Sequence, residues 1–113
     1  AGHFAQLGAV TRSSYSELAG QSFDIVINAT SASLGDALPP LPSGLFAAGS
    51  LAYEMMYGRS DTPFLTFAKA QGAERLADGL GMLVEQAAEA FHVWRGIRPD
   101  VAPVLAMLRN SGA

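Results

Sequence analysis

Three polar side chains follow an unbroken apolar run in the first third of the chain. Ile25, Val26 and Ile27 are consecutive β-branched residues, and Asn-Ala-Thr-Ser at 28–31 comes directly after them. A run that is apolar on both faces is typical of a parallel strand covered by helices. Because open α/β sheets bind ligands at the carboxyl ends of their strands, the amide and hydroxyls form a candidate binding site. The simpler alternative is an Asx or Ser/Thr turn that ends the strand.

Two more candidate groups lie later in the chain. Tyr57 has the strand parity of Met55, so it stands at the carboxyl end of a predicted strand over 50–56. A tyrosine has an apolar ring and a polar tip, and this one either faces a ligand or packs in the core. At about 100° per residue, Gly79 and Gln86 lie nearly in line on one helix face. The glutamine either donates a hydrogen bond into a cleft or is solvated.

Two other motifs indicate chemistry only weakly. Gly-Leu-Gly at 79–81 opens a helix as a dinucleotide phosphate loop would, but Val84 occupies the third glycine position. Glu89 and His92 have the Glu-x-x-His spacing of di-iron bundles, in one copy and without an accompanying glutamate pair. We therefore expect no metal site and interpret Glu89 as a surface residue.

The composition is that of one ordinary globular domain. The chain has 113 residues, 50% of them hydrophobic, and a formal net charge of −3. It lacks a Lys/Arg-rich run, which argues against nucleic acid, and an apolar run of the ~18 residues that a membrane span needs. The absence of cysteine excludes disulfides and thiol catalysis and fits a cytoplasmic location. Because the first residue is Ala1, inside a predicted helix, we expect a piece of a longer protein.

The elements that must position these groups follow from periodicity and capping residues. Thr62 with Pro63 is a good helix start, Asp100 caps a last helix, and Gly72 and Gly96 end the helices before them. The strongest helix, 80–95, has one broad apolar stripe of Leu80, Leu83, Val84, Ala87, Phe91 and Trp94. The sequence predicts strands at 9–11, 23–29, 50–56 and 73–77, a helix end at 3–7, a short helix near Ser14–Leu18, and helices at 63–71, 80–95 and 101–109.

Alternating strands and helices predict an α/β fold with a parallel sheet and crossover connections. We expect a partial Rossmann-like parallel sheet of about three to four short strands, with flanking helices and two C-terminal helices.

Five segments stand in the order found in shikimate dehydrogenases. They are 24–31 (Asp-Ile-Val-Ile-Asn-Ala-Thr-Ser), 53–57 (Tyr-Glu-Met-Met-Tyr), 62–65 (Thr-Pro-Phe-Leu), 77–88 (Ala-Asp-Gly-Leu-Gly-Met-Leu-Val-Glu-Gln-Ala-Ala) and 99–100 (Pro-Asp). The chain resembles this family over nearly its whole length from about Phe23 onward. One departure is Glu54, where the family usually has aspartate, and it leaves the hydrogen bonding at that strand end open.

This resemblance implies NADPH-dependent reduction of 3-dehydroshikimate to shikimate, a step of chorismate and aromatic amino-acid biosynthesis. It implies that the cofactor NADP is contacted by Thr30, Ser31, Ala32, Ser33, Met55 and Gly79. It also implies that Tyr57 and Gln86 contact the substrate, which agrees with the helix face shared by Gly79 and Gln86.

The resemblance further implies that the catalytic Lys–Asp pair, the glycine-rich phosphate loop and the segment selecting the 2′-phosphate lie outside this chain. We expect residues 1–78 to be the C-terminal part of a Rossmann-like NADP-binding domain. Residues 79–113 would form a helical segment packing toward a substrate domain. In the Rossmann strand order 3-2-1-4-5-6, the strand near Val10 would be strand 3 and the strand at 23–29 would be strand 4. Strand 4 would become an edge, because its neighbour, strand 1, is expected to lie outside this chain.

An apolar edge is a template for pairing. We expect the strand at 23–29 to pair with the strand near Val10 or with a second copy, and the surface around Phe91, Val93 and Trp94 to favour self-association as well. The chain alone is expected to be inactive, and the parent enzyme to bind small molecules rather than nucleic acid or membrane. Two alternatives are a non-catalytic nucleotide-binding or assembly half-domain and a quinate/shikimate dehydrogenase relative. The residues that distinguish NADP from NAD lie in the part that is expected to be missing.

Overall fold

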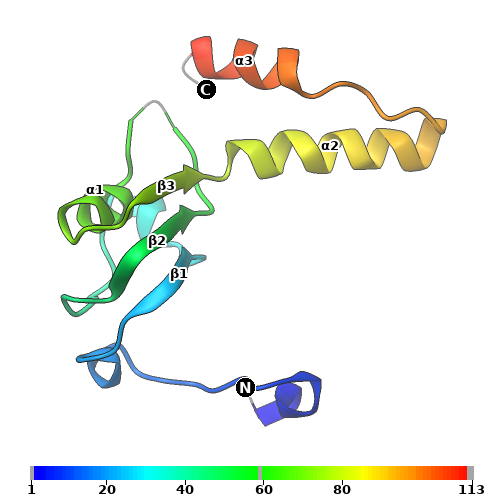
Figure 1. The fold of residues 1–113 in the computed structure, drawn as a ribbon. Helices are drawn as coiled ribbons and strands as arrows, with labels where there is room; N and C mark the ends of the chain where they lie inside the picture. Colours follow the sequence, from blue (N-terminus) through cyan, green and yellow to red (C-terminus); the bar gives the residue numbers. More distant parts are fainter. Residues whose placement is uncertain (1, 59, 112–113) are drawn as a thin grey trace.

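A parallel sheet forms the centre of the computed structural model, which describes residues 2–58 and 60–111 (Figure 1). Within those residues the sheet has three strands in the order β1-β2-β3. Their bounds are Phe23–Asn28, Phe46–Glu54 and Arg75–Asp78. Both pairings are parallel, so the connections after β1 and β2 return the chain to the edge of the sheet where the strands begin. The predicted α/β fold class is confirmed.

The crossover between β2 and β3 contains helix α1, Pro63–Ala70, whose ends are set by local chemistry. The backbone N–H of Leu65 donates to Thr62 Oγ1 at 3.4 Å, and Pro63 occupies the first helical position. Gly72 follows the helix with a φ of +93°, which glycine adopts without strain. These caps confirm the sequence prediction.

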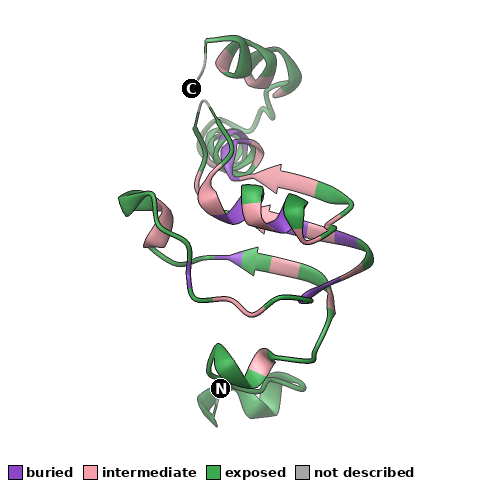
Figure 2. Cartoon of the chain, turned by 90° about the vertical axis from the view of Figure 1, so that its left-hand side faces the viewer, coloured by how far each residue is buried: buried purple, intermediate pink, exposed green. Residues whose placement is uncertain are grey.

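Helix α1 packs on one face of the sheet and forms the core with it. The buried apolar residues of this cluster are Leu45, Phe46, Ala52, Phe64, Leu65 and Ala68. The Phe46 ring centroid lies 6.3 Å from that of Phe64 and 6.2 Å from that of Phe67, within the usual range for aromatic pairs. Figure 2 shows the buried residues concentrated on α1, β2 and the start of the following long helix, with β1 largely exposed.

The opposite face of the sheet is open. Ile25 aligns with Leu51 and Ile27 with Tyr53, on the face away from α1. Ile25 is 58% and Ile27 59% exposed, so the prediction that this strand is buried on both faces is wrong. The described helices cover only the side of β1 that carries Val26. The prediction that this strand is an edge is confirmed by the strand order.

Strand β2 begins at Phe46, four residues before the predicted start. Its register with β1 moves from Phe23↔Phe46 to Ile25↔Leu51, so β2 contains extra residues between these pairs. Gly49 lies in this bulge with a φ of +76°, a conformation that favours glycine. Gly49 is therefore part of an irregular strand.

The segment before β1 is largely exposed. A 3-10 helix covers Gly2–Leu7 and a second covers Ser16–Leu18. The predicted strand at 9–11 is wrong, because these residues are exposed and do not pair with β1. Among the described strands, β1 pairs with β2 alone. A strand of only three residues, 9–11, would make few hydrogen bonds with β1 and bury little apolar surface. The free edge of β1 therefore stays open.

Helix α2 spans Leu80–Arg95, as predicted, and α3 spans Ala102–Asn110. Helix α2 projects away from the sheet, and α3 runs back alongside α2 (Figure 1). The buried residues of α2 are Leu80, Val84 and Ala88, whereas Trp94 is 79% exposed. The apolar stripe is therefore buried at Leu80 and Val84 and exposed at Leu83, Phe91 and Trp94. The expected exposure around Phe91, Val93 and Trp94 is confirmed.

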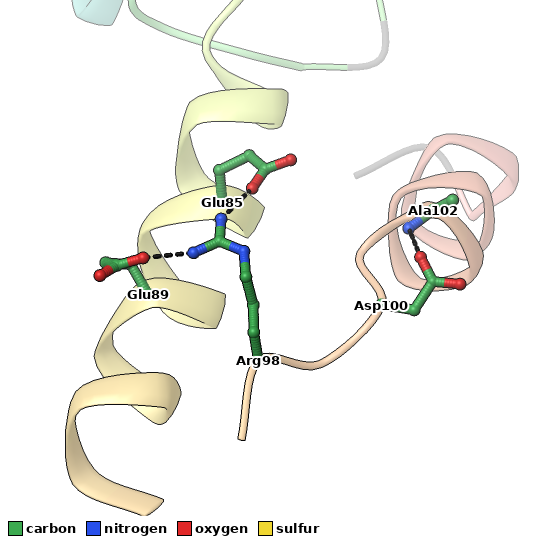
Figure 3. Close-up of polar contacts among 5 residues, drawn as sticks. All are labelled: Glu85, Glu89, Arg98, Asp100 and Ala102. Atoms are coloured by element: carbon green, nitrogen blue, oxygen red, sulfur yellow. Dashed lines mark hydrogen bonds and ion pairs between the residues drawn. The ribbon is translucent and has the colours of Figure 1, made fainter. Parts of the chain in front are cut away.

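Ion pairs hold the connection between α2 and α3 (Figure 3). The Arg98 guanidinium pairs with Glu85 at 2.9 Å and also with Glu89. The hydrogen bond that Arg98 donates to Glu89, followed by the one it donates to Glu85, raises the pKa of Arg98. The N-cap residue of α3 is Val101, one residue after the predicted Asp100, whose Oδ1 accepts from the Ala102 N–H at 3.1 Å in the turn that enters the helix. None of the described helices is both long and apolar enough to cross a membrane.

Candidate functional site

Each strand of the sheet ends on a polar residue at the carboxyl edge. Asn28, Glu54 and Asp78 are the last residues of β1, β2 and β3, and the register aligns them side by side. We call these three residues the strand-end row. Asn28 is 4% exposed and Glu54 is fully buried, while Asp78 is half-buried. Buried polar groups persist only where they are hydrogen-bonded, so this row must have local partners.

The strand-end row shapes the turns that leave the sheet. Each of its side chains accepts a hydrogen bond from the backbone N–H two residues further along. The pairs are Thr30 N to Asn28 Oδ1 (3.1 Å), Met56 N to Glu54 Oε1 (3.3 Å) and Leu80 N to Asp78 Oδ1 (3.2 Å). The chain therefore leaves all three strands through a turn fixed by the preceding side chain.

Glu54 connects the row to other segments. Its Oε2 atom accepts hydrogen bonds from Asn28 Nδ2 (3.0 Å), Ser33 Oγ (2.8 Å) and Thr62 Oγ1 (2.9 Å). One carboxylate thus joins the end of β1, the 3-10 turn Ala32–Gly35, the end of β2 and the start of α1. The sequence left the hydrogen bonding at this strand end open, because glutamate stands where the family usually has aspartate. In the structure, the Glu54 carboxylate accepts from four donors, which are these three and Met56 N.

The Asn-Ala-Thr-Ser segment forms the first part of the candidate site. Thr30 Oγ1 donates to Asn28 Oδ1 at 2.8 Å and accepts from Ala32 N at 3.3 Å. The Asx turn that the sequence allowed is therefore present, and it leaves Thr30 and Ser31 exposed while Ala32 and Ser33 are half-buried. The Ser33 hydroxyl is bonded to Glu54, so this side chain holds the turn.

Met55, Tyr57 and Gly79 come together at the same edge. Met55 N donates to Asn28 O at 3.1 Å, and Gly79 N donates to Met56 O at 3.2 Å. Met55 is 38% and Tyr57 41% exposed just beyond β2, and Gly79 is the cap residue of α2. Backbone hydrogen bonds thus join the segments at the carboxyl ends of all three strands.

Gln86 lies about two helical turns beyond Gly79. It is exposed on α2, as is Met82 between them. The structure places Gln86 on the projecting helix rather than at the sheet edge itself. Its predicted contact with a substrate stays a prediction.

An apolar groove lies away from the strand ends. Between α2 and α3 is a groove of about 350 Å³, lined by apolar side chains that include Leu83, Phe91 and Val104. It does not include the residues at the strand ends. We assign the candidate site to the carboxyl edge of the sheet, because polar groups and turns converge there.

Sequence reasoning found the exposed residues of this site but missed the strand-end row as a unit. In the sequence, Glu54 stands out only as a departure from the family pattern, and Asp78 only as a member of a motif. A partial signal for the row was present: the predicted strands at 23–29 and 73–77 end beside Asn28 and Asp78, and Glu54 lies two residues before the end of the predicted strand at 50–56.

A parallel sheet with an α-helical crossover and polar turns at its carboxyl edge defines a Rossmann-like α/β protein. Residues 79–109 match the family model of the shikimate 5'-dehydrogenase C-terminal domain. The chain is 65% identical over 108 residues to the shikimate dehydrogenase (NADP(+)) of Nitrosospira multiformis, covering 96% of this chain and 39% of that protein. Over these matched lengths the chain is similar to shikimate dehydrogenases.

Solved structures agree with this relationship. An Ael1 enzyme from Pseudomonas putida superposes with a TM-score of 0.77 at 61% identity, over 83% of this chain and 35% of that one. A shikimate 5-dehydrogenase of Thermus thermophilus, determined in complex with NADP(H) and shikimate, gives a TM-score of 0.65 at 34% identity, over 78% of this chain and 34% of that one. The chain spans about two-fifths of the length of the curated relatives it matches.

Proposed function

We propose that this chain supplies part of the cofactor and substrate site of an NADP-dependent shikimate dehydrogenase. The observation that carries the proposal is the convergence of Thr30, Met55, Tyr57 and Gly79 at the carboxyl edge of the sheet. Its relatives at 65% and 68% identity are named shikimate dehydrogenase (NADP(+)).

The residues present suit a nicotinamide nucleotide. Exposed hydroxyls at Thr30 and Ser31 and the half-buried turn at Ala32 and Ser33 offer polar partners for the nucleotide. The exposed Met55 side chain offers an apolar neighbour for a flat ring. When bound, NADP would supply the hydride chemistry, and this chain would supply positioning.

Tyr57 and Gln86 are the proposed substrate contacts. The phenol of Tyr57 and the amide of Gln86 are exposed hydrogen-bonding groups, suited to the hydroxyls and carboxylate of a shikimate-like ring. We place residues 1–78 in a nucleotide-binding part and 79–113 in a helical part directed toward a substrate domain. The start of α2 after Gly79, from which the helix extends beyond the sheet, supports this division.

A graft tests the proposal. Residues 2–111 replace the matching segment of the Nitrosospira multiformis dehydrogenase, and NADP reduction by shikimate is measured; we call this protein the grafted enzyme. We expect turnover, and we expect Tyr57→Phe and Gln86→Ala to lower kcat/KM for shikimate by about tenfold, the scale of a lost hydrogen bond to a polar substrate. A folded but inert graft would contradict the proposal.

The 113-residue chain by itself is expected to be inactive and to associate with itself. Exposed Ile25 and Ile27 beside the edge strand, and the apolar groove of α2 and α3, support this expectation. Sedimentation and amide exchange test it. A monomer whose β1 amides exchange freely would oppose association, and turnover by the chain alone would oppose inactivity.

A further inference from the structure

We propose that Glu54 is a positioning residue, which holds the nicotinamide-facing and substrate-facing residues in place without touching either ligand. This inference rests on the proposed dehydrogenase function and names a residue that the function does not by itself require. The observation behind it is the carboxylate's place at the centre of the strand-end row, fully buried and with donors from four segments.

The two oxygens of Glu54 have different tasks. Oε1 accepts from Met56 N at 3.3 Å, between Met55 and Tyr57. Oε2 accepts from Asn28 Nδ2 at 3.0 Å, and the same Asn28 side chain holds the Thr30 turn through Oδ1. One arm of the carboxylate therefore orients the segment proposed to meet nicotinamide and substrate. The other arm orients the turn proposed to meet the rest of the cofactor.

This division makes an amide substitution selective. All four partners of the Glu54 carboxylate are donors, and a glutamine has one acceptor oxygen and one donor NH₂. The oxygen of Glu54→Gln keeps the most bonds at the Oε2 position, where three donors converge. The NH₂ then faces the N–H of Met56, so the variant loses the bond that orients Met55 and Tyr57 and retains the link to Asn28.

The expected kinetic result in the grafted enzyme is a split between ligands. We expect Glu54→Gln to lower kcat/KM for shikimate by about tenfold to a hundredfold, because small displacements of positioning groups have effects of this size. We expect KM for NADP to change by less than about twofold, since the Asn28 arm is intact. Glu54→Asp retains a carboxylate acceptor and should recover most of the activity.

A matched control separates positioning from stability. Gln71 Oε1 accepts from Gly44 N at 3.1 Å, before the opposite end of β2. Gln71→Ala also removes one long-range hydrogen bond and should lower the unfolding temperature while leaving kcat and both KM values unchanged. If Glu54→Gln lowers stability in the same way and leaves the kinetics unchanged, Glu54 is only structural and the proposal is overturned.

Two further results complete the test. If Glu54→Gln does not fold, Thr62→Val removes one donor from the same carboxylate at the edge of the network. We then expect kcat/KM for shikimate to fall by about threefold, less than for Glu54→Gln, because only one donor to the carboxylate is lost. An unchanged kcat/KM would overturn the proposal. An unmodified graft without activity would instead contradict the proposed function, so the two failures are distinguishable.

Discussion

The carbonyl oxygen of Met55 occupies the place where a side chain at position 79 would begin. A Cβ atom built on Gly79 in ideal geometry would lie 1.9 Å from that oxygen and 2.7 Å from the carbonyl carbon. The φ of Gly79 is −79°, so the backbone conformation itself does not require glycine. The close approach of two backbone segments does, because the end of β2 and the start of α2 touch here.

We therefore predict opposite effects for the two glycines of the Gly-Leu-Gly segment. Gly79→Ala must separate β2 from α2 and should destabilise the grafted enzyme by about 2–4 kcal/mol, and it should lower activity by displacing Met55. Gly81→Ala has no heavy atom within 4 Å of its new Cβ and lies inside α2. It should be neutral or stabilising by up to about 1 kcal/mol. Urea unfolding measures both, and equal effects would refute the contact as the cause.

A second prediction concerns Ser50. Its hydroxyl is buried in β2 and has no hydrogen-bond partner among the residues that the structure describes. Ser50→Ala removes a desolvated polar atom and should stabilise the protein by roughly 1 kcal/mol. Ser43→Ala, in an exposed turn, is the control and should change the unfolding free energy by less than about 0.5 kcal/mol. A destabilised Ser50→Ala variant would show that the hydroxyl has a partner.

The Arg98 ion pairs lead to a third prediction, about the mobility of α3. Arg98→Ala removes the contacts to Glu85 and Glu89 and should speed hydrogen exchange of the α3 amides without changing that of β2. Because all three side chains are about half exposed, salt should narrow the difference between variant and parent. Arg95→Ala removes a cation near the end of α2 and leaves these pairs in place. If it has the same effect, helix charge rather than the ion pairs is responsible.

Acid should loosen the turn before β1. Glu17 Oε2 accepts from Ser14 N at 2.8 Å and Ser14 Oγ accepts from Glu17 N at 3.3 Å, a reciprocal capping arrangement. The backbone hydrogen bond from Ser14 lowers the pKa of Glu17. A lowered folded-state pKa stabilises the turn at pH values above the unfolded pKa, and this stabilisation is lost as the pH falls through the folded pKa.

NMR titration of the Ser14 amide measures this transition. We expect its chemical shift to change as the pH falls through the lowered Glu17 pKa, and its protection from exchange, relative to an unstructured amide at the same pH, to decrease. In Glu17→Gln the amide oxygen still accepts from Ser14 but does not titrate, so the same titration should be flat. A transition that persists in this variant would assign the effect to another group.

The sequence predicted features that depend on neighbouring residues. The cap of α1 at Thr62 and the end of α2 before Gly96 are decided by side chains and backbone conformations within one turn. The bounds of α2 were accordingly correct. Thr30, Met55 and Gly79 were brought to one sheet edge because the carboxyl ends of parallel strands necessarily lie together.

The features that sequence reasoning missed are non-local. An apolar run such as 25–27 has the same composition whether helices cover one face or both, so the exposure of Ile27 follows only from where α1 lies. Glu54 receives hydrogen bonds from Asn28, Ser33 and Thr62, residues 26, 21 and 8 positions away. No local pattern specifies such a set, and the burial of Glu54 became evident only with the chain folded.

The exposed outer end of α2 also carries a natural optical reporter. Trp94 is the one tryptophan in the sequence, and its side chain is 79% exposed. Indole emission moves to shorter wavelength when water is removed from the ring, so covering this end of α2 changes the colour of the fluorescence. Pairing at the free edge of β1 leaves the indole in water and the spectrum unchanged. A single emission spectrum, recorded as concentration rises, therefore distinguishes which of the two open surfaces closes first.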